Sequence, residues 1–173
     1  GREPVGNVIL TCIPGEQHTL GIIMVGEFLL RDGWRVMVGA PWSESDLLTM
    51  VGTEWYDVIG FSVGSESRLP LLKRDIRRLK SASRNPHVQF MVGGQVFRDD
   101  PTLADQVGAN AIAASAREAP QTARRLLDMS QRAASKPLSA TLARAFSKAG
   151  PDESIEVTCA APPASAATVK PPV

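Results

Sequence analysis

Cysteine is scarce in this chain of 173 residues, in which Cys12 and Cys159 are the only two. They lie far apart, and neither belongs to a C-x-x-C pair or to a Cys/His spacing. This pattern argues against a structural zinc site and against a disulfide framework. It is typical of proteins in a reducing compartment, so we expect a cytoplasmic location.

An excess of charge and long apolar runs are also missing. The formal net charge is +1, which gives no global attraction to nucleic acid, and we expect no direct DNA binding. The longest apolar stretch, 20–30, is interrupted by Gly21, Gly26 and Glu27. It is too short to span a bilayer, so we expect a buried helix and no contact with a membrane.

The chain begins Gly1-Arg2-Glu3-Pro4, without an initiator methionine or a signal segment. We therefore expect a fragment of a longer protein or a processed chain. Its length fits one medium domain, which we place at 7–134 after a linker or remnant at 1–6. A further helix is expected at 135–150, followed by a flexible Pro/Ala-rich tail at 151–173.

Short apolar runs alternate with helical patterns along 7–134. Continuous apolar runs are typical of strands buried on both faces, and they occur at 7–11, 34–38, 58–63, 87–92 and 111–113. Helical patterns lie between and after them, at 18–31, 43–50, 69–79, 101–107 and 117–134. This alternation predicts an α/β three-layer sandwich of the flavodoxin-like type, with a five-stranded parallel sheet in the order 2-1-3-4-5.

Ligands of open parallel sheets bind beyond the carboxyl ends of the strands. The predicted topology nominates the loops 12–20, 39–43, 62–66, 93–98 and 113–117. His18 lies in the first loop, whereas His87 precedes the fourth strand at the opposite edge. Glu16 is close enough in sequence to orient the His18 imidazole and leave one ring nitrogen for a metal ion. By spacing alone, a loop histidine is more often a plain polar residue.

Small residues follow the third and fourth strands at Ser62, Gly64, Gly93 and Gly94. They either admit a slender ligand close to the backbone or form tight turns. Neither G-x-G-x-x-G nor G-x-x-x-x-G-K-[ST] occurs, so dinucleotide and P-loop sites lack their phosphate cradle. Trp42 follows the second strand, where an indole can pack on a flat ligand.

The other tryptophans and the first cysteine are expected to be structural. Trp34 and Trp55 are predicted to lie in or near the core, and Cys12 is predicted to be a buried, inert thiol. The segment around the third helix is locally basic and carries Arg68, Lys73, Arg74, Arg77, Arg78, Lys80 and Arg84. A solvated helix face explains such a run, and a surface for an acidic partner or nucleic acid is the alternative.

Three segments together resemble the cobalamin (vitamin B12)-binding domain family, whose pattern combines D-x-H-x-x-G, S-x-L/V and G-G. They are Glu16-Gln17-His18-Thr19-Leu20-Gly21, Ser62-Val63-Gly64 and Gly93-Gly94, within a likeness that extends from about 7 to 127. The resemblance implies that His18 is the lower cobalt ligand in place of benzimidazole and that Glu16 orients it. It also implies that the small residues line a channel for the displaced nucleotide tail.

The chain departs from the family pattern at three positions. Glu16 is one methylene longer than the aspartate of the family, which alters the geometry of its hydrogen bond to the histidine. Ser115 and Asn110 stand where relatives often carry acidic residues.

Within that family, further phrases are similar to antirepressors of photosynthesis genes in purple bacteria, the AerR, PpaA and AppA type. These phrases are Ser62-Val63-Gly64, Arg68-Leu69-Pro70, Asn85-Pro86 and the segment 91–97. The resemblance implies a tetrapyrrole sensor, for cobalamin or heme, that is not an enzyme and that antagonises a transcriptional repressor. In the AppA type the domain senses heme beside a blue-light flavin domain, so a flavin in a separate domain of a photoreceptor belongs to the same expectation.

Other interpretations stay open. The glycines favour cobalamin because its tail needs a channel, whereas heme needs an axial base and an apolar slot. One alternative function is the corrinoid-carrier subunit of a methyltransferase or mutase, in which the cofactor supplies the chemistry. Another is a docking domain that has lost its ligand.

Overall fold

The computed structural model describes residues 3–13, 19–39 and 42–135. The helix expected beyond residue 135 and the Pro/Ala-rich tail therefore lie outside the described residues. The described residues form five strands: β1 (Asn7–Cys12), β2 (Arg35–Gly39), β3 (Val58–Ser62), β4 (Gln89–Gly93) and β5 (Ala111–Ile112). The helices are α1 (Leu20–Arg31), α2 (Glu44–Thr53), α3 (Leu69–Ala82), α4 (Gln95–Asp99), α5 (Leu103–Val107) and α6 (Ala119–Ser135), with a 3₁₀ turn at Glu66–Arg68.

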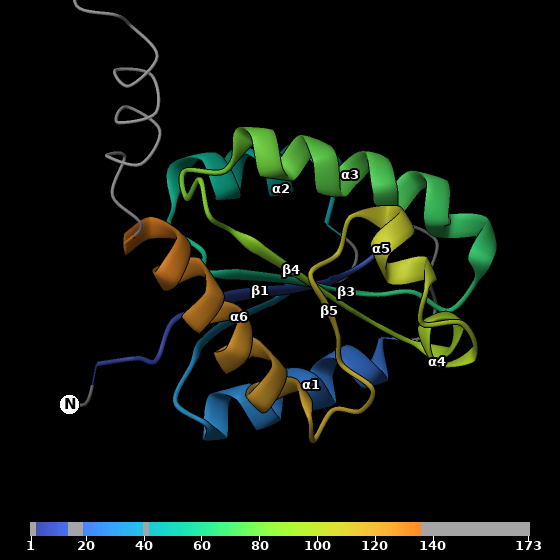
Figure 1. Cartoon of the computed structure of the whole chain (residues 1–173), viewed down its shortest axis with the longest axis horizontal. Coiled ribbons are helices and arrows are strands. Elements are labelled where there is room, and N and C mark those ends of the chain that lie inside the picture. Colours follow the sequence, from blue (N-terminus) through green and yellow to red (C-terminus); the bar gives the residue numbers. More distant parts are fainter. Residues whose placement is uncertain (1–2, 14–18, 40–41, 136–173) are drawn as a thin grey trace, which may run out of the picture. The chain divides into compact units, whose positions relative to one another are not determined.

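The strands form one parallel sheet in the order β2-β1-β3-β4-β5. Helices α1 and α6 cover one face, and α2, α3 and α5 cover the other (Figure 1). The predicted α/β class, strand order and three-layer sandwich are therefore confirmed. All strands run in one direction, so their carboxyl ends meet at one edge of the sheet.

Side chains of the inner strands alternate between two separate apolar cores, one on each face of the sheet. Ile9, Ile59 and Phe90 point to the side of α2 and α3, while Leu10 and Met91 point to the side of α1 and α6. These side chains are almost completely buried. Burial on both faces explains why β1, β3 and β4 read as continuous apolar runs in the sequence.

Helix α1 is less buried than its composition predicts. Only Ile22, Gly26 and Leu29 are buried, at spacings of four and three residues. The outward face exposes Leu20 (70%), Ile23 (55%), Met24 (48%) and Leu30 (53%) to solvent. The expectation of a buried helix is wrong because a helix in an outer layer packs only one stripe against the sheet.

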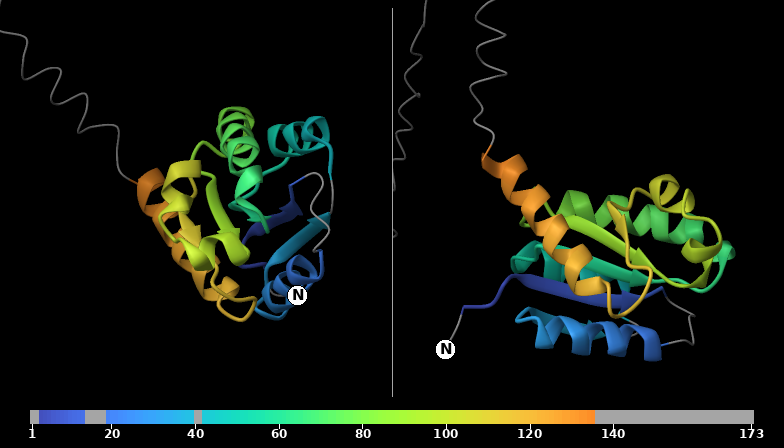
Figure 2. Two further views of the ribbon diagram at one scale, coloured as in Figure 1. Left: turned by 90° about the vertical axis from the view of Figure 1, so that its right-hand side faces the viewer. Right: turned by 60° about the horizontal axis from the view of Figure 1, so that its bottom comes forward.

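The carboxyl end of α1 is tied to α6. Asp32 follows the last residue of α1, and Gly33 then takes a positive φ of 91° that closes the helix. The Arg124 guanidinium on α6 donates hydrogen bonds to the Asp32 carboxylate (2.7 Å) and to its backbone oxygen (3.0 Å). The bond from Arg124 holds the pKa of Asp32 below its usual value. Figure 2 shows α1 and α6 beside each other on one face of the sheet.

Most sequence-predicted boundaries of helices and strands lie within a few residues of the observed ones. Two other predictions, on a loop and on a tryptophan, differ from the structure. The helix α4, Gln95–Asp99, was expected as loop, because five residues are too few to show a helical period. Trp34 is buried as expected, but Trp55 is 47% exposed and its indole donates to the Asp57 carboxylate. The Ser43 hydroxyl caps α2 by accepting a hydrogen bond from the Asp46 amide, as predicted.

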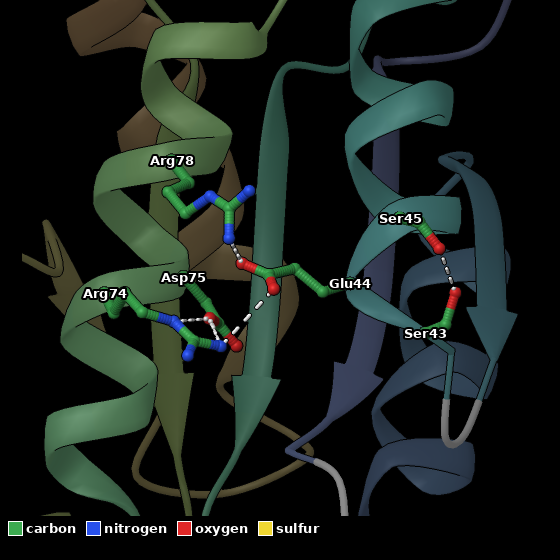
Figure 3. A network of polar contacts seen from close by, with 6 residues as sticks. All are labelled: Ser43, Glu44, Ser45, Arg74, Asp75 and Arg78. Carbon is green, nitrogen blue, oxygen red and sulfur yellow. Dashed lines mark hydrogen bonds and ion pairs between the residues drawn. The ribbon is translucent and has the colours of Figure 1, made fainter.

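The basic helix α3 is partly neutralised by its neighbour α2. Glu44 at the start of α2 accepts hydrogen bonds from Arg74 (3.4 Å) and Arg78 (2.5 Å), as Figure 3 shows. Arg74 also donates to Asp75 at 3.0 Å. Two of the cations of the basic run therefore hold the two helices together, which supports the interpretation of a largely structural, solvated face.

Asp75 is the buried member of this network, with 7% of its surface exposed. Burial raises the pKa of Asp75 from its ordinary 3.8, and the Arg74 guanidinium offsets part of that rise. The folded protein thus binds the proton more tightly than the unfolded chain does. Above pH 3.8 the free energy of unfolding consequently falls as pH rises through the folded-state pKa.

We expect Asp75→Asn to remove this contribution, because asparagine keeps the size of the side chain without the charge. The free energy of unfolding of the variant, relative to the wild type, should increase from acidic to neutral pH. Urea unfolding at several pH values measures this difference. Asp105→Asn, which alters an exposed carboxylate on α5, is the control and should follow the wild-type profile. A difference that stays constant with pH would contradict the assignment.

Candidate functional site

A cavity of about 330 Å³ opens at the carboxyl edge of the sheet, on the side of α1 and α6. Its size lies within the range of small-molecule sites, roughly 300–1,000 Å³. One wall is the first turns of α1, the base is formed by β1, β3 and β4, and the opposite wall is the loop 113–116 that leads into α6. The cavity therefore lies where the sheet topology predicts a ligand.

The strands carry several small residues at the base of the cavity. The strand register places Gly60 between Leu10 and Met91, and one row further along it places Ser62 beside Gly93. Gly60, Ser62 and Gly93 all face the side of α1 and α6, because every second residue of a strand faces the same side of the sheet. A Cβ atom at Gly60 would lie 2.6 Å from the Leu10 side chain, and one at Gly93 would lie 3.2 Å from the backbone oxygen of Ala113. Glycine at these two positions therefore lets neighbouring groups pack closely at the base of the cavity.

Gly94 shapes the turn from β4 into α4. Its φ is +120°, a backbone conformation that side chains rarely adopt. A Cβ atom at this position would also lie 2.0 Å from the backbone oxygen of Val63. Glycine is therefore required for the turn, which brings the backbone of β4 and α4 against the end of β3. The tight-turn interpretation of the double glycine therefore holds for Gly94, and both glycines also line the cavity.

Gly21 has a different role at the wall of the cavity. A Cβ atom built at this residue of α1 would meet no atom within 4 Å. The absence of a side chain therefore serves neither backbone conformation nor packing. It leaves open the space between α1 and the ends of the strands, where Gly21 lines the cavity.

The polar groups that line the cavity are few. Ser62 contributes a hydroxyl from the end of β3, Ser115 one from the loop before α6, and Arg98 a guanidinium from α4. Ser115 also accepts a hydrogen bond from the Glu118 amide at 3.3 Å. The remaining described lining is hydrocarbon or backbone. An arrangement of this kind binds a mostly apolar group and orients it with a small number of hydrogen bonds.

Four of the predicted site residues come together at this cavity: Gly21, Ser62, Gly93 and Gly94. Gly64 lies just beyond β3 and outside the lining. Trp42 is also outside it, because its indole packs against Gly39 and the core on the α2 side of the sheet. Glu16 and His18 lie outside the described residues, so their assigned roles stay predictions.

Among the lining residues that sequence reasoning missed, Gly60 and Arg98 are the most informative. Gly60 faces the cavity in the middle of β3, and its place in the alternation of that strand was the available signal. Arg98 was missed because its position depends on α4, which no periodicity indicated. His87 lies just before β4, at the amino edge of the sheet and away from the cavity, as predicted.

Three further expectations concern a metal ion, the Cys12 thiol and a membrane span. Among residues 3–13, 19–39 and 42–135, no three His, Cys, Asp or Glu side chains are grouped closely enough to hold a metal ion. Cys12 is buried, as expected. None of the described helices is long and apolar enough to cross a membrane.

Solved structures share this architecture. A cobalamin-binding protein from Desulfitobacterium hafniense DCB-2 superposes with a TM-score of 0.65 at 17% identity, over 72% of this chain and 60% of that one. The monomethylamine corrinoid protein of Methanosarcina barkeri gives a TM-score of 0.62 at 20% identity, over 70% of this chain and 57% of that one. Identities this low show a common fold.

Sequence comparison gives a relative and a family. A Rhodobacter capsulatus protein, "Uncharacterized 20.5 kDa protein in bchF-crtJ intergenic region", is 29% identical over 105 residues, which are 61% of this chain and 54% of that protein. The chain thus spans about half the length of this curated relative. The family model described as "B12 binding domain" matches residues 6–124, well over half of the chain. The chain therefore belongs to the B12-binding domain family.

Proposed function

We propose that this chain binds a tetrapyrrole, with cobalamin favoured over heme, and acts as a sensor and interaction domain of a bacterial regulator. The observation that carries the proposal is the convergence of Gly21, Ser62, Gly93 and Gly94 on one cavity. These four residues belong to all three segments of the family pattern. Their assembly at a single opening is what a base-off cobalamin requires for its nucleotide tail.

The residues fit cobalamin better than heme. The described part of the cavity lies between α1 and the loop 113–116, with small residues at its base. A space between two such walls suits a flat base carried on a flexible tail, whereas heme binding does not need it. Gly21 keeps the space open without a structural reason of its own. Bound cobalamin supplies a cobalt ion that accepts an axial nitrogen ligand, and His18 would provide that nitrogen, with Glu16 orienting its ring.

Under this proposal the chain binds the tetrapyrrole and catalyses no reaction of its own. The described lining offers Ser62, Ser115 and Arg98 as polar side chains. The Ser115 hydroxyl donates to the Glu118 carboxylate at 3.3 Å, but Glu118 lies outside the lining. The described lining contains no imidazole or carboxylate that could activate the Ser62 hydroxyl as a nucleophile. A corrinoid carrier, the kind of protein named in the Methanosarcina barkeri structure, would need a separate partner for its substrate.

The regulatory role rests on the antirepressor resemblance and is supported by the name of the Rhodobacter capsulatus relative, which refers to the bchF-crtJ intergenic region. In this role the ligand state changes the contact of the domain with a transcriptional repressor of photosynthesis genes. Operator binding by that repressor, measured with and without the ligand-loaded protein, tests the role. An unchanged operator affinity would exclude antirepression and leave tetrapyrrole binding untouched.

We expect the purified protein to retain hydroxocobalamin through desalting and to show a shifted visible spectrum. His18→Ala should lose the spectral shift, because the axial nitrogen is removed, and should retain less corrinoid. A parallel titration with hemin distinguishes the two tetrapyrroles. Retention of hemin alone would point to a heme sensor. Retention of neither would leave the docking-domain alternative, and methyl transfer to bound cobalt would favour the corrinoid carrier.

We expect Gly21→Leu to weaken cobalamin binding by about tenfold to a hundredfold, because the leucine side chain would occupy space that the bound ligand needs. Stability should be unchanged or slightly higher, because the new side chain meets open space and glycine is a poor helix residue. Spectroscopic titration and thermal unfolding measure the two effects. Ser81→Leu is the matched control, because Ser81 is exposed on α3 across the sheet and should leave binding unchanged.

A further inference from the structure

Arg98 is the one charged side chain among the described residues that line the cavity. It belongs to α4, which starts directly after the Gly94 turn. The neighbouring Val96 and Phe97 are buried, with 5% and 1% of their surfaces exposed, and they fix the short helix in the core. The position of Arg98 at the cavity is therefore set by packing, although its own side chain is exposed.

The charge of Arg98 is available to a ligand. Its guanidinium donates to the amide oxygen of Gln95, which is neutral. Gln95 in turn donates to Asp99 at 2.6 Å, so the adjacent carboxylate is engaged elsewhere. No described carboxylate lies within ion-pair distance of Arg98. A guanidinium with most of its five donors unassigned, beside an apolar cavity, is suited to bind an anionic oxygen group.

We propose that Arg98 binds an anionic oxygen group of the ligand and makes the site selective for a tail that carries one. This inference rests on the proposed function, under which the group is the phosphodiester of the cobalamin nucleotide tail. The apolar part of the tail enters between α1 and the strands, and Arg98 holds the phosphate. In heme the equivalent group would be a propionate carboxylate. Arg98 is a specificity residue under this proposal, and it is independent of the axial ligand at His18.

The test compares cobalamin with cobinamide, which has the same corrin ring without the nucleotide and its phosphodiester. Wild-type protein should bind cobalamin more tightly. Arg98→Gln should weaken cobalamin binding by about tenfold to a hundredfold, the range for loss of charge-assisted hydrogen bonds. Its affinity for cobinamide should stay at the wild-type value, and the salt dependence of cobalamin binding should decrease. The cobalamin affinity of Arg98→Lys should lie between those of the wild type and Arg98→Gln.

Arg117→Gln is the matched control, because Arg117 is an exposed cation beside the loop 113–116 and outside the cavity lining. It should bind both corrinoids like the wild type. Equal losses in the two variants would reduce the effect to general electrostatics and overturn the proposal. Equal losses of cobalamin and cobinamide in Arg98→Gln would also overturn it, since the phosphate would then be irrelevant.

The same experiment separates this proposal from the proposed function. Unchanged cobalamin affinity in Arg98→Gln, with binding by the wild type, overturns the role of Arg98 and leaves tetrapyrrole binding in place. Failure of the wild type to bind cobalamin, cobinamide and hemin overturns both. Thermal unfolding of each variant confirms that an exposed Arg98 can be replaced without loss of the fold. If the protein retains hemin alone, hemin is compared with its dimethyl ester, in which the propionate charges are removed. Arg98→Gln should then weaken the binding of hemin and leave the affinity for the ester at the wild-type value.

Discussion

The pairing of β3 with β4 determines whether this protein has a site at all. It places Ser62 beside Gly93 in one row, with Gly60 one row earlier on the same face. Parallel pairing fixes these neighbours because the two strands share direction and register. If β4 slipped by one residue, large core side chains would face α1 and α6, and Gly93 would face the other core. The fit of Gly94 against Val63 holds the correct register at the strand ends.

The two faces of the sheet are stabilised differently. On the side of α2 and α3, a large apolar core is supplemented by the ion pairs of Glu44 with Arg74 and Arg78. On the other side, a cavity lies under the first turns of α1, and the helix leaves apolar side chains in contact with solvent. Cavities reduce stability because their lining lacks partner atoms. The dense face can compensate for the open one, so the domain can keep a cavity and remain folded.

The sequence predicted the fold well because the apolar runs of the strands and the helical patterns between them are both local signals. Apolar runs such as 7–11 identify strands, and the rule on carboxyl ends then places Ser62 and Gly93 at one edge without any coordinates. The exposure of α1 was not predictable in the same way, since an apolar composition does not reveal how many sides of a helix are covered. Trp42 and Arg98 were misplaced or missed because their positions depend on a loop path and on a five-residue helix.

The bond between Asp32 and Arg124 joins α1 to α6 at the end of α1 that lies away from the cavity. At its other end, α1 borders the opening through Gly21, and the loop 113–116 that leads into α6 borders it from the opposite side. Ile22, the residue after Gly21, is buried and packs this end of α1 on the sheet. Helix α1 is therefore held near both ends, so a ring system has to fit the space that Gly21 leaves between the two walls.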